Sequence, residues 1–172
     1  MSIIAGPADA PVARFASLDV APDLAVLIVS YQSAADLGLL FDSLRAEAVG
    51  RRIRVVVADN ASTDGSARGR KGDVVVIETG GNLDYGGGLN AAMSHVGEAP
   101  AILVLHPDVG LEPGCIAALE NRTRVSGAGI VVPRILYAVG ALSLSLRREP
   151  SVIRAFGDAL LGSRWSKTDG GC

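Results

Sequence analysis

Four short apolar runs of the sequence each end in polar side chains or glycines that could bind a ligand. In chain order these candidate residues are Ser30 and Tyr31, then Asp59, then Asn82, Gly87, Gly88 and Asn90, and finally His106 and Asp108. Carboxylates accept hydrogen bonds or bind cations, and glycines let backbone N–H groups approach phosphates. Ligands of an open parallel sheet bind beyond the carboxyl ends of its strands. We therefore expect these residues to converge at one edge of a sheet.

Asp59 ends the second apolar run and precedes the polar segment 60–65. A carboxylate at a strand end could accept hydrogen bonds from a nucleobase or a ribose. Asp59, Ser62 and Asp64 could equally make no more than a hydrogen-bonded turn. Position alone leaves both interpretations open.

Asp108 follows the fourth run, in the segment His106-Pro107-Asp108. Its carboxylate could hold a divalent cation against a diphosphate. Alternatively, it could cap the helix expected from Glu112 or make a turn with Pro107. His106 could bind a metal ion or a ribose, although a strand-end histidine with its own hydrogen bonds satisfied is the more common case. The glycines at 86–88 could cradle phosphates or form a flexible turn.

The elements that must position these residues alternate along the chain. Runs rich in Val and Ile predict strands at 24–29, 53–58, 74–77, 101–105 and 128–132. Such runs are typical of strands buried on both faces of a parallel sheet. Apolar residues at helical spacing predict helices at 34–48, 86–96 and 112–121, the last with Pro113 in its first turn. The alternation predicts an α/β domain with a parallel sheet.

Composition excludes several classes of protein. A net charge of −2 and an aromatic content of 4% disfavour nucleic-acid binding. No apolar stretch approaches the ~18–20 residues that cross a bilayer. The cysteines, Cys115 and Cys172, make no disulfide framework, and no basic signal region opens the chain, so we expect a cytoplasmic location. The turn at 30–34 contains no glycine, so the dinucleotide fingerprint of an oxidoreductase is missing.

Segments 26–31, 57–66, 82–90 and 105–109 together resemble the ordered motifs of family 2 glycosyltransferases, in particular the rhamnosyltransferase-like branch. The resemblance covers residues 24–136. It implies the GT-A fold, a three-layer αβα arrangement with a mainly parallel sheet. It also implies a hexosyltransferase with a nucleoside-diphosphate sugar donor, of the dTDP-rhamnose or UDP-sugar class, and a glycan or lipid-linked acceptor.

The resemblance also implies roles for the candidate residues. Asp59 reads the nucleobase, and Ser30 and Tyr31 line that pocket. The remaining donor-binding residues, near the ribose and diphosphate, are Asn82, Gly87, Gly88, Asn90 and His106. The segment 106–108 takes the place of the family's Asp-X-Asp motif, with Asp108 as ligand of Mg²⁺ or Mn²⁺. The family usually has Asn where Gln32 stands, Gly where Asp84 stands, and Asp or Asn where His106 stands.

The two ends of the chain complete the expected organisation. We expect residues 1–22 to form a loose arm with one packed segment around Phe15. We expect residues 23–140 to form the nucleotide-sugar-binding domain. Residues 141–172 predict a partial acceptor-side segment or tail, with an edge strand at 143–146 and an amphipathic helix at 151–161. Family members commonly continue further, so we expect a fold truncated at its C-terminal side, with no catalytic base in this chain and self-association through that helix. The alternative is a non-catalytic nucleotide-binding module or a degenerate fragment. A lipid-linked acceptor would place the chain at the inner face of a membrane.

Overall fold

The computed structural model describes residues 13–66, 72–137 and 140–143. The chain divides into two compact units, residues 1–131 and 132–172, which are treated separately below. The candidate residues all belong to the first unit. No helix in the described part of the chain is long and apolar enough to cross a membrane.

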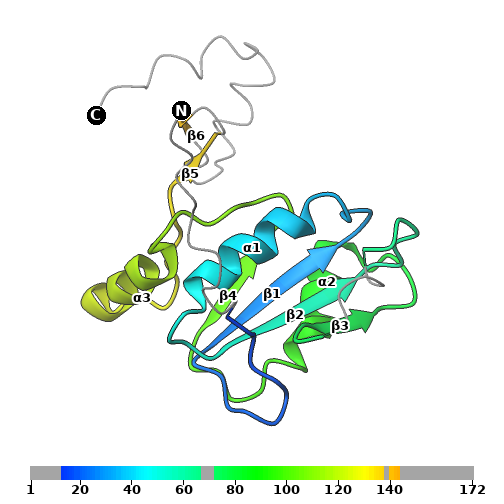
Figure 1. The fold of residues 1–172 in the computed structure, drawn as a ribbon, viewed down its shortest axis with the longest axis horizontal. Coiled ribbons are helices and arrows are strands. Elements are labelled where there is room, and N and C mark those ends of the chain that lie inside the picture. The colour runs from blue at the N-terminus through cyan, green and yellow to red at the C-terminus, as the bar shows by residue number, and fades with distance from the viewer. Residues whose placement is uncertain (1–12, 67–71, 138–139, 144–172) are drawn as a thin grey trace, which may run out of the picture. The chain divides into compact units, whose positions relative to one another are not determined.

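A parallel four-stranded sheet forms the centre of the first unit (Figure 1). Its strands are β1 (Leu24–Ser30), β2 (Ile53–Asp59), β3 (Val75–Glu78) and β4 (Ile102–Leu105), in the order β3-β2-β1-β4. Every residue of β1 and β2 is buried, because these two strands have a neighbour on each side and helices on both faces. The parallel sheet predicted from the apolar runs is confirmed.

Helices cover both faces of this sheet, so the three-layer αβα arrangement is also confirmed. On one face, Val26 and Ile28 pack with Leu40 and Leu44 of α1 (Leu37–Glu47) and with Ile116 of α3 (Cys115–Ser126). On the other face, Ala25, Leu27, Val56 and Ala58 of the strands pack with Ala92 of α2 (Asp84–Met93). Figure 1 shows α1 in front of the strands and α2 behind them.

The sheet differs from the sequence-based prediction at its edges. The edge strands are not buried on both faces: Ile102 and Val104 of β4 are 41% and 44% exposed. Each edge strand pairs with a single neighbouring strand, so its side chains have fewer neighbours to bury them. The strand predicted at 128–132 is wrong: the structure has irregular backbone there, and Ile130 is 86% exposed.

All three helices begin at positions other than those predicted, and α1 begins at Leu37 rather than Ala34. Helix α2 begins at Asp84 rather than Gly86. Helix α3 begins at Cys115, so Pro113 lies before the helix and not in its first turn. The start of α3 is set by a contact from α1. The buried Glu47 carboxylate accepts hydrogen bonds from the backbone N–H groups of Gly114 (2.6 Å) and Ile116 (3.0 Å). An anion at this position satisfies N–H groups that the helix itself leaves unpaired.

A packed segment around Phe15 joins the first unit, as predicted. Phe15 is 4% exposed, and its N–H donates to Asp73 (2.8 Å). Arg45 donates to both carboxylate oxygens of Asp73 (2.7 and 2.8 Å) and lies over the Phe15 ring. This ion pair lowers the pKa of Asp73 to about 2. The segment therefore closes one end of the core beside α1.

The second unit contains a short antiparallel pair, β5 (Ile135–Leu136) with β6 (Leu142–Ser143). Only the first residue of the strand predicted at 143–146 is described, and it belongs to β6. The helix predicted at 151–161, with its apolar face, lies outside the described residues.

Candidate functional site

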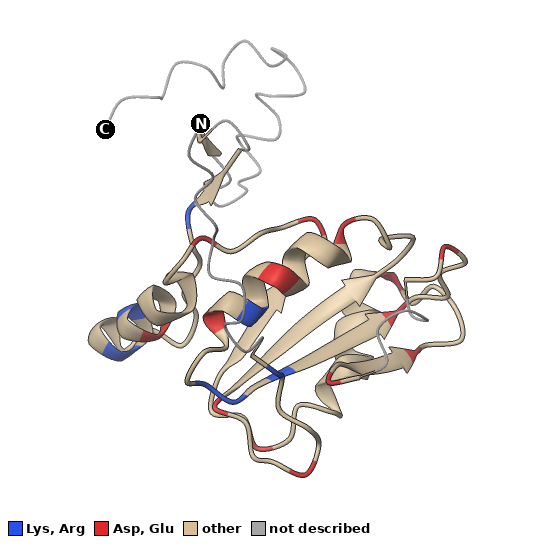
Figure 2. Cartoon of the chain, viewed as in Figure 1, with Lys and Arg blue, Asp and Glu red and all other residues tan. Residues whose placement is uncertain are grey.

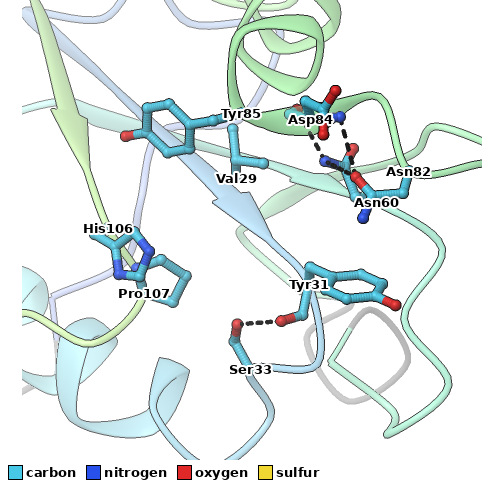
Figure 3. A pocket seen from close by; sticks show the side chains of 9 residues that line it. All are labelled: Val29, Tyr31, Ser33, Asn60, Asn82, Asp84, Tyr85, His106 and Pro107. Atoms are coloured by element: carbon cyan, nitrogen blue, oxygen red, sulfur yellow. Dashed lines mark hydrogen bonds between the residues drawn. The ribbon is translucent and has the colours of Figure 1, made fainter.

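A pocket of about 340 Å³ opens at the carboxyl end of the sheet, where the sequence places the candidate residues. Figure 3 shows His106 and Pro107 on one side of it, with Asn60, Asn82 and Asp84 on the other. The lining residues are Val29, Tyr31, Ser33, Asn60, Asn82, Asp84, Tyr85, His106 and Pro107. Tyr31, Asn82 and His106 were singled out from the sequence, and the structure brings them together. The others were missed, although Asn60 and Pro107 directly adjoin predicted residues.

Ser30 and Asp59 lie at the ends of adjacent strands and precede the lining residues Tyr31 and Asn60. The two are paired in register between β1 and β2. They are 0% and 2% exposed, yet Ser30 Oγ and Asp59 Oδ1 have no hydrogen-bond partner among the described residues. A buried polar atom without a partner costs about 1–3 kcal/mol. Neither residue lines the pocket itself, and an unpaired atom beside a pocket is one that a ligand or a water molecule can satisfy.

The turn after β2 is joined to the turn after β1 by hydrogen bonds. The backbone N–H of Gln32 donates to Ser62 Oγ (3.0 Å), and that of Ala34 donates to Asp64 Oδ2 (2.8 Å). Asp64 also accepts from the Ser66 hydroxyl, and these bonds lower its pKa. Ser62 and Asp64 thus make the hydrogen-bonded turn considered from the sequence. Asp59 shares in it through Oδ2, which accepts from the Ser62 N–H (3.0 Å).

The backbone is left-handed at two positions where this chain departs from the family's usual residues. Gln32 has φ +52° and Asp84 has φ +57°, both in the left-handed region. Gly adopts this region at the lowest cost, and Asn and Asp adopt it more readily than Gln. The family usually has Asn at position 32 and Gly at position 84. Gln32 compensates through its side chain, which donates to Thr63 Oγ1 (3.0 Å) and accepts from the Asp64 N–H (3.2 Å).

Asn60 fixes the segment that leads into α2. Its Nδ2 donates to the Asp84 carbonyl (3.0 Å) and to Asn82 Oδ1 (3.4 Å), and its Oδ1 accepts from Thr79 Oγ1 (3.2 Å). Asn82 Oδ1 also accepts from the Asp84 N–H (3.0 Å). These bonds hold Asn82 and Asp84 against the pocket (Figure 3).

The glycines of α2 have a packing role in this structure. A Cβ on Gly88 would lie 2.7 Å from Val29 Cγ1, and one on Gly87 would lie 2.8 Å from Leu83 Cβ. Gly88 therefore lets α2 approach the sheet closely. Gly87, Gly88 and Asn90 do not line the pocket, and Asn90 is exposed. Their role beside a diphosphate stays a prediction.

His106 and Asp108 form a close pair beside the pocket. His106 Nδ1 lies 2.5 Å from Asp108 Oδ1, with the two side chains 60% and 62% exposed. The exposed Tyr85 ring lies 6.4 Å from the His106 ring, centroid to centroid. Asp108 does not cap α3, whose N-cap is Gly114, so that alternative is wrong.

The charged residues around the pocket are acidic. The segments that follow the four strands, 30–36, 59–66, 79–86 and 106–112, contain Asp and Glu but no Lys or Arg. Figure 2 shows the described Lys and Arg elsewhere, mainly at the opposite end of the sheet and on α3. No group of three His, Cys, Asp or Glu that could hold a metal occurs within the described ranges. One or two carboxylates with substrate phosphates are nevertheless a usual Mg²⁺ site, and the Asp108 carboxylate fits that chemistry.

The fold is an α/β domain with a pocket at the carboxyl ends of its parallel strands, where open sheets of this kind bind ligands. The family model described as "Glycosyl transferase family 2" matches residues 25–166. The chain therefore belongs to glycosyltransferase family 2, which confirms the family indicated by the four motifs.

Individual relatives agree with this assignment. The chain is 34% identical over 158 residues to the N-acetylglucosaminyl-diphospho-decaprenol L-rhamnosyltransferase of Mycobacterium tuberculosis, covering 84% of this chain and 51% of the relative. It is 30% identical over 122 residues to the low-salt glycan biosynthesis hexosyltransferase Agl10 of Haloferax volcanii, covering 69% of this chain and 38% of the relative. This chain thus spans about half the length, or less, of these relatives.

Among solved structures, TarS of S. aureus, residues 1–349, matches with a TM-score of 0.50 and 19% identity. The match covers 67% of this chain and 40% of TarS. It supports the GT-A fold.

Proposed function

We propose that this chain supplies the donor-binding part of a hexosyltransferase that uses a nucleoside-diphosphate sugar of the dTDP-rhamnose or UDP-sugar class. The observation that carries the proposal is the pair of buried oxygens, Ser30 Oγ and Asp59 Oδ1, which lack partners among the described residues. They lie at the strand ends directly before the pocket-lining residues Tyr31 and Asn60. The polar groups of a nucleotide can make hydrogen bonds to these two oxygens.

The nucleobase is assigned to the β1–β2 end of the pocket. A carboxylate accepts hydrogen bonds, and the N3–H of uracil or thymine is a donor that adenine lacks at the equivalent position, N1. Asp59 Oδ1 is the acceptor we assign to this N–H. Tyr31, which is 53% exposed, provides an aromatic face at the same edge.

The ribose and diphosphate are assigned to the side of the pocket that Asn82 and His106 line, with Gly87, Gly88 and Asn90 nearby on α2. The described segments around this edge contain carboxylates but no Lys or Arg, which favours a cation as the counter-ion of a diphosphate there. We assign Mg²⁺ or Mn²⁺ to the turn 106–108, where Asp108 supplies negative charge. When bound, a divalent cation stabilises negative charge on the leaving diphosphate as a Lewis acid.

The acceptor class is proposed from the relatives. Their names include a diphospho-decaprenol acceptor and glycan biosynthesis, which favours a glycan or lipid-linked acceptor and a role in cell-wall or polysaccharide synthesis. An acceptor in a membrane would place the protein at the inner, cytoplasmic face. Membrane binding and self-association stay predictions, which vesicle flotation and sedimentation can test.

Thermal shift with defined nucleotides tests the proposal. UDP or dTDP with MnCl₂ should raise the melting temperature, and NAD should not. A stabilisation by NAD equal to that by UDP would overturn the donor assignment. Incubation with dTDP-rhamnose or UDP-sugars and glycan or lipid-linked acceptors then separates transfer from nucleotide binding alone.

A further inference from the structure

The His106–Asp108 pair has a geometry that bears on which atom contacts the cation. The 2.5 Å contact joins Asp108 Oδ1 to His106 Nδ1, the ring nitrogen nearer the main chain. An ionised carboxylate can only accept, so Nδ1 carries the hydrogen and donates. In the neutral imidazole, Nε2 is then left with an available lone pair.

The two ring nitrogens point away from each other. An ion on Nε2 therefore lies across the ring from Asp108, and the paired carboxylate cannot reach the same ion. Metal-binding histidines almost always donate their other N–H to a carboxylate or a carbonyl, which fixes the tautomer and the ring orientation. The pair reproduces that arrangement, and His106 itself lines the pocket.

A second contact restricts the imidazole. The Tyr85 ring lies at 31° to the His106 ring, with centroids 6.4 Å apart. Tyr85 also lines the pocket, in the first turn of α2. The imidazole is thus held by Asp108 on one side and bordered by an aromatic ring.

We propose that His106 binds the divalent cation directly through Nε2, and that Asp108 acts as a positioning residue that orients the imidazole. This proposal rests on the proposed function, since the diphosphate supplies the remaining ligands. It has a consequence for metal selectivity. Imidazole binds late first-row ions more tightly than Mg²⁺, whereas an all-oxygen site suits Mg²⁺. This chain should therefore favour Co²⁺ over Mg²⁺ more strongly than its variant with an Asp-X-Asp sequence.

Pulsed EPR of Mn²⁺ bound with UDP tests the ligand directly, using protein labelled with ¹⁵N-histidine. We expect ¹⁵N coupling in the natural sequence and in His95→Gln, which removes the other histidine of the chain, a partly buried residue just beyond α2. The coupling should vanish in His106→Asp while Mn²⁺ still binds. Bound Mn²⁺ without histidine coupling, or coupling that persists in His106→Asp, would overturn the proposal.

Calorimetry gives a second measurement that is independent of activity. His106→Asp should lower the ratio of Co²⁺ to Mg²⁺ affinity, measured with UDP present. Asp108→Asn should weaken Co²⁺ binding by roughly 10–100-fold, as expected when an orienting group is lost. An unchanged metal ratio in His106→Asp, with UDP still bound, would overturn the ligand assignment and leave the proposed function standing. If the natural sequence does not bind UDP at all, both the ligand assignment and the proposed function are overturned.

Discussion

Ser30 and Asp59 lie opposite each other at the ends of two parallel strands, and each has one buried oxygen without a partner among the described residues. Parallel pairing brings the two strand ends to the same edge of the sheet, and helices on both faces exclude water from the strands. The chain thereby places a desolvated hydroxyl and a desolvated carboxylate oxygen at the strand ends that directly precede the pocket-lining residues Tyr31 and Asn60. A ligand with complementary donors gains from satisfying groups that folding left unpaired.

The close approach of α2 to β1 depends on the absence of a side chain at Gly88. In Gly88→Ala the new Cβ would lie 2.7 Å from Val29 Cγ1, so we expect a loss of about 1–3 kcal/mol in the free energy of unfolding. Gly86→Ala is the matched control, since no atom lies within 4 Å of its Cβ position. That variant should gain about 0.5–1 kcal/mol from helix propensity. Denaturant unfolding measures both, and equal effects would contradict this account of the packing.

Asp84 combines a left-handed backbone with a carboxylate at the pocket. Asp84→Gly relieves the backbone and Asp84→Ala does not, so the glycine variant should be more stable than the alanine variant by about 1 kcal/mol. Both variants remove the charge, so both should bind UDP more tightly than the natural sequence. Thermal unfolding and calorimetry measure the two effects. Weaker UDP binding in both variants would show instead that the carboxylate contributes to the site.

The Arg45–Asp73 pair makes stability depend on pH. The pKa of Asp73 falls from 3.8 to about 2 on folding, so its contribution is complete above pH 4–5 and disappears as pH falls through 2. Asp73 is 15% exposed, and the shift corresponds to about 2 kcal/mol. Asp73→Asn should therefore lose about 2 kcal/mol at neutral pH. The difference between the two proteins should shrink between pH 4 and pH 2, and a difference independent of pH would contradict the ion-pair explanation.

Nucleotide binding should depend on a divalent cation through Asp108. Asp108→Ala removes the carboxylate that orients His106, so roughly 10–100-fold more MnCl₂ should be needed to raise the UDP affinity. Asp36→Ala is the control, because it removes an exposed acidic residue from the same edge without touching the pocket lining. Titrations with and without MnCl₂ measure the dependence. Identical metal effects in the natural sequence and in Asp108→Ala would exclude this location for the cation.

The sequence predicts the centre of the fold well because burial there follows from local composition. Continuous apolar runs identify β1 and β2, and the polar residues that follow them identify the ligand-binding edge. The run at 128–132 has the same composition but no strand partner among the described residues, and composition alone cannot supply one. The start of α3 depends on Glu47, which is 67 residues before Gly114 in the chain. Long-range contacts of this kind are not encoded in a local pattern.

The pocket lining could be predicted only in part, for Tyr31, Asn82 and His106, and not at the level of atoms. Strand ends place Asp59, Tyr31, Asn82 and His106 at one edge. The sequence does not show that one oxygen of Asp59 is used in a turn while the other is unpaired, because that depends on how two loops meet. The positive φ angles of Gln32 and Asp84 and the pairing of His106 with Asp108 are likewise visible only in three dimensions.

The selectivity of Asp59→Asn tests the central claim, that the β1–β2 end of the pocket binds a pyrimidine base. The asparagine can still accept from the Ser62 N–H through its carbonyl, while an NH₂ group, a donor, replaces the unpaired acceptor Oδ1. Calorimetry with MnCl₂ should show that the natural sequence binds UDP more tightly than ADP by about 1–3 kcal/mol. Asp59→Asn should lose most of that preference while remaining folded. Equal affinities for UDP and ADP in the natural sequence, or an undiminished preference in Asp59→Asn, would contradict the account.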